Sequence, residues 1–550
     1  MNPNRKRLLT VDEACGTLIK ATVATSARGT PLVGTFVVIP SDDDLVLGRI
    51  TKVSLTNPIH SDDKFAPMIM ERGLVPHWSG EVDIERAEID IIAAIDTKIG
   101  KRIPFRRNPA SGTVVLAADH SEINLFANEQ TYQLILGYIP NTNGLPCSVI
   151  NRHFADMHDQ SGKDIGGYGE ARHSAIFGQS GSGKTVLLTM LISGRLAACP
   201  QMGLLMPDTS GDLADPNRHS RGSYRWNYDQ VLKQAGVSIE RISIADIRLT
   251  SPDTLKYKLA PLLREQLSIA SEKAVTLSDR VVHGLFGTEV ELDRLTAPLI
   301  ADAVIEYIGG CYEAKTKADK IRDAQSLKDD QRRMDHFRRS FETVRRLFDG
   351  RYPLWQLVRD ILEHGRKIII EMNQIAENDQ RFVMHEVIEK LTNQARRLFH
   401  KSTRCNAMIV LDEAQRWVPE GNGDEETISR TIAEGFRETR KYGIGWIVVA
   451  QSPAGLSKRV IRECHTKYFG RNLGIGSDRA HIQDILSKEG AEAYQQLQIQ
   501  GGYFWVGVGL DANLGSGSSY FTLHPFDGDA TQAFINANQH IFSSSNNVGQ

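Results

Sequence analysis

The stretch HSAIFGQSGSGKTVLLTMLISGRLAA, residues 173–198, decides the fold of this chain. A short apolar strand leads into a segment that matches the pattern GxxxxGK(S/T) in full, and a helix-compatible run follows it. The glycines let the backbone wrap a phosphate with its N–H groups, and the helix N-terminus adds a positive dipole. The pattern therefore predicts an ATP site made of Gly178, Gln179, Ser180, Gly181, Ser182, Gly183, Lys184 and Thr185.

A P-loop needs a second, acidic element, and MIVLDEAQ (residues 408–415) supplies one. Its four apolar residues predict a buried strand, with Asp412 and Glu413 at the carboxyl end, where α/β sheets place ligands. We expect Thr185 and Asp412 to hold Mg²⁺, while Lys184 reaches the β- and γ-phosphates. Glu413 is the candidate general base for the attacking water, and a Glu beside the Asp favours hydrolysis over exchange or transfer.

Two further stretches fit a motor. Residues 446–452 (WIVVAQS) predict a strand that ends in Gln451, an amide placed to sense the γ-phosphate or the lytic water. Just before it, residues 434–443 carry Arg437 and Arg440, candidate arginine fingers for a neighbouring subunit. A finger raises the rate roughly 10³- to 10⁵-fold because it offsets charge on the γ-phosphate. The alternatives are a cap or buried hydrogen bond for Gln451 and an exposed helix end for the arginines.

The chain changes texture along its length. The first part, 1–135, predicts a small antiparallel β-barrel, with strand-like runs at 32–39, 45–55, 82–95 and 113–118. From about Val149, helical stretches alternate with short apolar runs typical of buried parallel strands. These runs lie at 175–177, 203–206, 367–371, 408–411 and 446–449. They predict an α/β sheet with helices on both faces.

A charged, helical insertion at 255–350 interrupts this α/β core and divides it into 149–254 and 351–540. Residues 314–346 carry an intermittent apolar stripe, which consists of Ile321, Leu327, Met334, Phe337, Phe341, Val344 and, just beyond, Leu347. A solvated amphipathic helix or hairpin and a DNA or partner contact both fit this stripe. The polar end, 541–550, predicts a flexible tail.

The composition limits how this chain can meet its partners. Its 65 Lys+Arg against 67 Asp+Glu give a net charge of −2, so a nucleic-acid site has to be local or repeated in an oligomer. The 6 cysteines form no CxxC pair, which argues against a zinc ribbon and favours a reducing compartment. No apolar stretch approaches about 18 residues, so we expect a cytoplasmic protein without membrane contact.

Five elements in order resemble the HerA family within the HerA/FtsK group of ring ATPases. They are Arg172-His173 before the P-loop, Asp208-Thr-Ser-Gly211-Asp212, LDEAQRWVP (411–419), ETRKYGIGWIVVAQSP (438–453) and the N-terminal VGTFVVIP…LGRITKVSL (33–55). The last looks like the family's small barrel, the HAS-barrel. Gln415 and Thr439 depart from the pattern, which usually has His and Gly there.

This resemblance implies a RecA-like P-loop ATPase core with a HAS-barrel-like N-terminus and a helical insertion. It implies a homohexameric ring that translocates on double-stranded DNA and works with a separate effector, a nuclease or a sirtuin-like NAD-cleaving enzyme. A bacterial subunit of antiphage defence or DNA processing fits this description. It also adds Arg172 to the candidate catalytic residues, because Arg172 matches a family arginine.

Two other functions fit the same motifs. In the first alternative, the ring is an ATP-gated scaffold that assembles and regulates the effector. In the other it is a coupling ATPase of conjugation, which fits the motor core but not the barrel or the lack of a membrane segment. The loop RHSRGSYR (218–225) is either a DNA contact or an ordinary surface loop.

Overall fold

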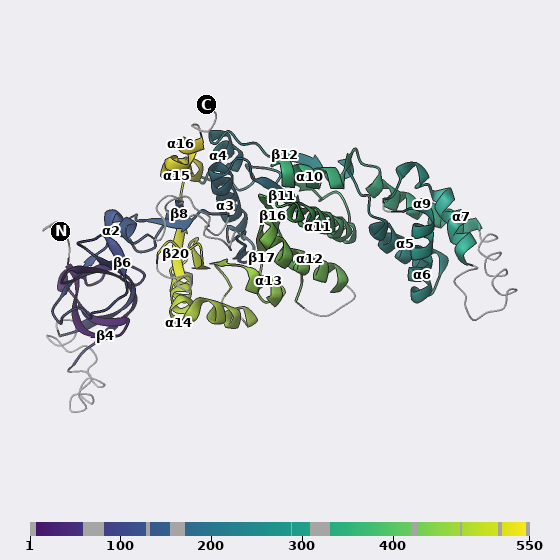
Figure 1. Ribbon diagram of the computed structural model, residues 1–550. Coiled ribbons are helices and arrows are strands. Elements are labelled where there is room, and N and C mark those ends of the chain that lie inside the picture. The colour runs from purple at the N-terminus through teal and green to yellow at the C-terminus, as the bar shows by residue number, and fades with distance from the viewer. Residues whose placement is uncertain are drawn as a thin grey trace, which may run out of the picture.

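The computed structural model describes residues 7–58, 82–127, 133–142, 144–153, 171–287, 289–308, 331–420, 426–473, 476–514 and 520–545. A β-barrel, an α/β core and a helical bundle follow one another in space. The barrel and the bundle lie at opposite ends of an elongated molecule, with the core between them (Figure 1).

The N-terminal part is a barrel that, within these ranges, six strands close. β2 pairs with both β1 and β5, which completes the order β2-β1-β7-β3-β4-β5, and β6 lies outside β5. Alternating apolar residues such as Val37, Ile39 and Ile89 fill the interior. The predicted barrel is thus confirmed. Its strands are β1 (Arg7–Cys15), β2 (Leu18–Val23), β3 (Phe36–Ser41), β4 (Asp44–Thr56), β5 (Ile84–Asp96), β6 (Lys101–Ile103) and β7 (Val114–Ala117).

The core is one mixed sheet, eleven strands wide in the described part of the chain, with the order β12-β15-β11-β16-β17-β10-β18-β19-β20-β8-β9. From β12 to β18 all neighbours are parallel, and from β18 to β9 they are antiparallel. The strands are β8 (Gln133–Tyr138), β9 (Pro146–Ile150), β10 (Ser174–Phe177), β11 (Gly203–Asp208), β12 (Glu240–Ser243), β15 (Lys367–Glu371), β16 (Ala407–Leu411), β17 (Ile444–Ala450), β18 (Thr466–Gly470), β19 (Trp505–Gly509) and β20 (Tyr520–Pro525).

Helices cover both faces of this sheet, because successive strand residues point to opposite sides. Phe177, Ile409 and Val448 face one core with α10, α11 and α12, while Ile176 and Met408 face the other with α3, α4 and α15. The predicted α/β class is therefore confirmed. The helices of the core are α3 (Lys184–Ala198), α4 (Tyr228–Gln234), α10 (Leu354–His364), α11 (Glu377–His400), α12 (Glu426–Thr439), α13 (Lys458–Glu463), α14 (Ser477–Gln500, bent at Ser487), α15 (Ala530–Ala537) and α16 (Gln539–Ser545).

The insertion is a bundle that contains, among the described residues, four helices: α5 (Pro252–Leu267), α6 (Ser271–Leu285), α7 (Ala297–Ile308) and α9 (Gln331–Arg345). The apolar stripe of α9 is buried between α5 and α7, with Met334, Phe337, Phe341 and Val344 in the core. Ile321 and Leu327 of the predicted stripe lie outside the described residues. The short parallel pair β13 (Ile247–Arg248) and β14 (Tyr352–Pro353) closes the base of the bundle.

The barrel is joined to the core by helix α2 (His120–Leu125) and by a buried arginine. Arg49 of β4 is 4% exposed; its Nη1 donates to the Tyr520 carbonyl oxygen at 2.8 Å, and its guanidinium lies 3.3 Å from the centre of the Tyr520 ring. Barrel residues such as Phe36 and Leu47 belong to the same apolar cluster as Leu134 of β8. The barrel therefore has a fixed seat on the antiparallel end of the sheet.

The first half of the predicted flexible tail, 541–550, is helical, and residues 546–550 lie outside the described part of the chain. Residues 541–545 belong to α16, where Ile541 and Phe542 are buried in the cluster around Phe534 and α3. The polar composition of this end predicted a tail because it gave no sign that its two apolar side chains pack against α3. Among the helices that the structure describes, none combines the length and hydrophobicity needed to cross a lipid bilayer.

The bundle is anchored to the core by one buried carboxylate. Oε1 of Glu386, on α11, accepts hydrogen bonds from the backbone N–H of Thr250 at 2.7 Å and of Ser251 at 3.0 Å, just before α5 begins. Burial raises the pKa of Glu386, and the backbone donors work against that rise. An ion pair between Lys258 and Asp379 also joins α5 to α11.

Glu386→Ala is expected to lower the free energy of unfolding by about 2–4 kcal/mol, because two buried backbone N–H groups lose their acceptor. Glu386→Gln keeps a carbonyl oxygen there and is expected to lose less than half as much. Urea denaturation followed by circular dichroism measures both. An alanine variant as stable as the glutamine variant would show that Glu386 does not anchor the bundle.

Candidate nucleotide site

The phosphate-binding loop lies between β10 and α3, at the carboxyl edge of the parallel strands. Gly181 and Gly183 have φ of 75° and 89°, a backbone region that disfavours side chains. A Cβ on Gly178 would lie 2.3 Å from the Ser182 hydroxyl oxygen, so the loop is wound tightly on itself. The Ser182 hydroxyl is buried and has no hydrogen-bond partner among the described residues.

Lys184 occupies the hollow of this loop. Its Nζ donates to the carbonyl oxygens of Gly178 at 2.8 Å and Gln179 at 3.3 Å. Burial lowers the pKa of Lys184, and the nearby charges of Glu413 and Asp412 partly restore it. The structure therefore brings the P-loop lysine and the predicted acidic pair together, although more than 200 positions separate them in the sequence.

The acidic pair sits directly after β16. Asp412 is 8% exposed; burial, followed by the charge of Glu413, raises its pKa to about 7. Glu413 adopts φ of 50°, and its N–H donates to Asp412 Oδ1 at 2.9 Å. A hydroxyl from Thr185 and a carboxylate from Asp412 are the hard oxygen donors that Mg²⁺ prefers, so these residues fit that ion.

Two amides hold the carboxylate of Glu413. Gln451 Nε2 lies 3.3 Å from both of its oxygens, and Gln415 Nε2 donates to Oε2 at 2.5 Å. The sequence predicted a role at the site for Gln451. It predicted none for Gln415, which was noted only as a departure from the family pattern. Its position two residues after Glu413, on the turn η5 (Ala414–Arg416), was the available signal. Thr439, the other departure, accepts a hydrogen bond from Trp446 Nε1 at 2.8 Å inside the core.

The three candidate arginines lie away from their own P-loop. Arg172 and Arg440 precede β10 and β17, whereas the phosphate loop and Gln451 follow these strands. At about 3.3 Å per residue, Arg172 is roughly 20 Å from Gly178. Arg440 Nη1 lies 3.5 Å from the Glu463 carboxylate, and Arg437 is exposed in the last turn of α12. One chain therefore does not bring these arginines to its own phosphates.

Arg172 belongs to a buried ionic cluster. Its Nη1 lies 2.9 Å from Oδ1 of Asp511, and Arg195 Nη2 lies 3.4 Å from Oδ2 of the same carboxylate, which is 1% exposed. Beside it His173 is fully buried, donates from Nε2 to the Phe436 carbonyl at 3.0 Å and accepts the Trp446 N–H on Nδ1. Burial lowers the pKa of His173 to about 3, so this histidine is neutral and connects α12 to β17 through hydrogen bonds.

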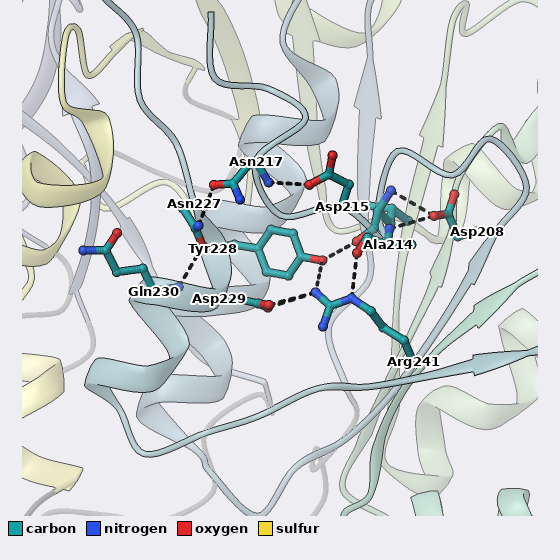
Figure 2. A network of polar contacts seen from close by, with 10 residues as sticks. Asp208, Ala214, Asp215, Asn217, Asn227, Tyr228, Asp229, Gln230 and Arg241 are labelled. Atoms are coloured by element: carbon teal, nitrogen blue, oxygen red, sulfur yellow. Dashed lines mark hydrogen bonds and ion pairs between the residues drawn. The ribbon is translucent and has the colours of Figure 1, made fainter.

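The loop after β11 is built on one carboxylate (Figure 2). Asp208, fully buried, accepts backbone hydrogen bonds of 2.8–3.2 Å from Ser210, Gly211, Leu213 and Ala214. Arg241 donates to the Ala214 carbonyl at 2.6 Å and to Asp229 at 2.9 Å, and it also reaches the Tyr228 hydroxyl. Asp208 thus shapes the polypeptide next to β16 rather than binding a phosphate itself.

The basic segment 218–225 continues this loop. Arg218, Arg221 and Arg225 are all exposed, and Arg218 forms an ion pair with Asp212. Arg221 and Tyr224 exchange backbone hydrogen bonds of 3.0–3.1 Å, so the segment is a tight hairpin. Its charge is partly balanced by its own aspartate, which fits an ordinary surface loop as well as a contact with DNA.

Family comparisons bear on the same residues. A family model described as "Helicase HerA, central domain" matches residues 171–391, and one described as "Zonular occludens toxin (Zot)" matches residues 352–501. The chain is 22% identical over 482 residues to the DNA double-strand break repair helicase HerA of Pyrococcus furiosus, with 80% of this chain and 78% of that protein covered.

Solved structures with a similar arrangement include VirB4 of Thermoanaerobacter pseudethanolicus, at a TM-score of 0.41 and 11% identity over 74% of this chain and 99% of that one. The unbound bacterial conjugative coupling protein TrwBdeltaN70 has a TM-score of 0.40 and 13% identity, over 75% and 93% of the two chains.

Asp511→Ala is expected to lower the free energy of unfolding by about 3–5 kcal/mol, because Arg195 is left buried without its carboxylate. Arg172→Ala should lose clearly less, since Asp511 keeps its contact with Arg195. Urea denaturation of both variants at pH 7.5 measures the difference. Equal losses in the two variants would mean that Asp511 serves Arg172 alone.

Proposed function

The chain belongs to the HerA family of P-loop ATPases, and we propose that it hydrolyses ATP with Mg²⁺ to move a homohexameric ring along double-stranded DNA. One observation carries the catalytic half of this proposal. Lys184, Asp412 and an amide-held Glu413 converge at one edge of a single sheet. A lysine for phosphate charge, a carboxylate for a cation and an oriented base are the parts that hydrolysis of a phosphoanhydride needs.

Each residue has a defined task in this site. The backbone N–H groups of Gly178–Thr185 cradle the phosphates, and Lys184 exchanges its two carbonyl partners for phosphate oxygens. Glu413 accepts a proton from the attacking water, while Gln415 and Gln451 fix the direction of its carboxylate. Thr185 and Asp412 would hold Mg²⁺, which when bound neutralises charge on the phosphates.

The positions of the arginines and the charge of the chain support the proposed ring. Because Arg440 is at the strand edge opposite its own P-loop, it reaches a γ-phosphate only across a subunit boundary. Arg437 is exposed beside it, whereas Arg172 is held by Asp511 and acts, in this proposal, by supporting that edge. A net charge of −2 also favours an oligomer, in which each cation that faces DNA is repeated.

The relative named above is a repair helicase, which supports DNA as the substrate. We further propose that a separate polypeptide, a nuclease or a sirtuin-like NAD-cleaving enzyme, supplies the second activity, as in antiphage systems. The support for this effector is the family resemblance of the sequence alone. A direct test asks whether the purified ring moves on DNA without any partner.

Glu413→Gln is expected to bind ATP as the native protein does but to lose at least about 100-fold in turnover, because an amide does not accept the proton of water. Lys184→Ala should lose turnover together with nucleotide affinity. Turnover, ATP affinity and displacement of a third strand from double-stranded DNA are measured on both variants and on the native ring. The native protein should displace the strand without any partner, and neither variant should displace it.

Two outcomes would contradict the proposal. Normal turnover by Lys184→Ala in a preparation free of contaminating ATPases would remove the nucleotide site from the P-loop. Full ATP turnover without strand displacement, together with an ATP-dependent change in the activity of the effector protein, would favour the ATP-gated scaffold instead of a translocase.

Mixed rings test whether Arg440 acts across a boundary. Lys184→Ala subunits lack a working phosphate site but keep Arg440, and Arg440→Ala subunits have the reverse defect. Each parent ring should be inactive, and mixing should restore part of the turnover wherever an intact Arg440 faces an intact P-loop. Native mass spectrometry verifies that the rings have six subunits and have mixed.

Thermal unfolding of Arg440→Ala is the necessary control, because Arg440 contacts Glu463. If the variant is folded and its mixed rings stay inactive, Arg440 acts within its own subunit or only stabilises the fold. Arg437→Ala, which removes an exposed neighbouring cation, is the matched comparison.

A further inference from the structure

The order of strands fixes the direction in which a bound nucleotide extends. Asp412, Glu413 and Gln451 follow β16 and β17, which lie on one side of β10, and β18 lies on the other side. The triphosphate end of a nucleotide in the P-loop is drawn toward Lys184 and the acidic pair. A nucleotide bound in this direction would place its sugar and base over the side where β18 ends and β19 begins.

On that side an aromatic ring and a cation border the P-loop. Arg471 comes directly after β18, and its Nη2 donates to the Gly181 carbonyl at 3.0 Å. The Arg471 guanidinium lies 4.4 Å from the centre of the Tyr503 ring. A Cβ built on Gly183 would lie 3.9 Å from Tyr503 Cδ1 and 4.0 Å from the ring of Trp505. The two aromatic rings thus stand against the turn that leads into α3.

These two aromatic residues differ in one respect that points to a ligand. Trp505 is 2% exposed and forms the wall, whereas Tyr503 is 52% exposed. The backbone of Tyr503 is nevertheless held, because His524 Nδ1 donates to its carbonyl oxygen at 2.9 Å. A ring that is anchored, backed by a guanidinium and open to solvent beside a phosphate loop is preorganised to stack on a flat group.

We propose that Tyr503, supported by Arg471, is the base-stacking subsite of the nucleotide site. This inference rests on the proposed function, since it takes the P-loop as the place of the phosphates. The ligand class is a purine nucleoside di- or triphosphate whose base lies on the free part of the Tyr503 ring. Stacking contacts the π-face that every base has, so the subsite adds affinity with little choice between adenine and guanine.

The test compares ligands with and without a base. ADP, GDP and inorganic pyrophosphate are titrated by calorimetry into the native protein, Tyr503→Ala and Tyr503→Phe. Tyr503→Ala is expected to weaken ADP and GDP binding about 5- to 150-fold, the range found for base–aromatic stacking, and to leave pyrophosphate binding within about twofold. Tyr503→Phe keeps the ring and should bind all three as the native protein does.

Three results would overturn the subsite. Unchanged ADP affinity in Tyr503→Ala would show that the base lies elsewhere, and a parallel loss of ADP and pyrophosphate would show that the ring only supports the P-loop. A native preference for ADP over GDP of more than about tenfold would require hydrogen-bond readout in place of stacking. Lys184→Ala tests the premise separately from the inference. If that variant still binds both ADP and pyrophosphate, the phosphates do not bind in the P-loop, and the proposed function fails rather than the subsite alone.

Discussion

The parallel pairing of β10, β17 and β16 is the constraint on which the site depends. Phe177 pairs with Ala450, and Leu411 pairs with Val448, so the residues that follow each pair emerge at one edge of the sheet. These strands are buried on both faces, and the parallel backbone pairing holds them in this register. The P-loop, the acidic pair and Gln451 are therefore neighbours because hydrophobic packing places the strand ends together.

That edge concentrates charge in a buried place. Burial raises the pKa of Asp412, and repulsion between Asp412 and Glu413 adds to that rise. Lys184, itself partly desolvated, provides the nearby positive charge and meanwhile bonds to loop carbonyls. Part of the electrostatic energy of this arrangement is unfavourable without a ligand, and a phosphate with its cation would reduce it. The site is thus organised to bind the charges of a phosphate and its cation.

The sequence was sufficient wherever a signal is local. The P-loop, the runs that became β11, β15, β16 and β17, and the α9 stripe all follow from neighbouring residues. Contacts between distant segments were not accessible in this way: Asp511 meets Arg172 across 339 positions, and Arg471 meets Gly181 across 290. The sequence also did not predict strands β18–β20, because their short runs carry no motif and their pairing depends on register.

The same sheet connects the nucleotide loop to the barrel. Arg471 touches Gly181 at the end of β18, β18 pairs with β19, and β19 pairs with β20, which ends the series at Tyr520 and its buried contact with Arg49. The strand pairings and the Arg49 contact are buried, so neither yields without loss of a buried interaction, whereas the Arg471 contact with Gly181 is open to solvent. The core sheet therefore links the phosphate loop to the barrel, whose strands form a separate sheet. Relative movement of the two requires this pairing, or the seat of Arg49, to break.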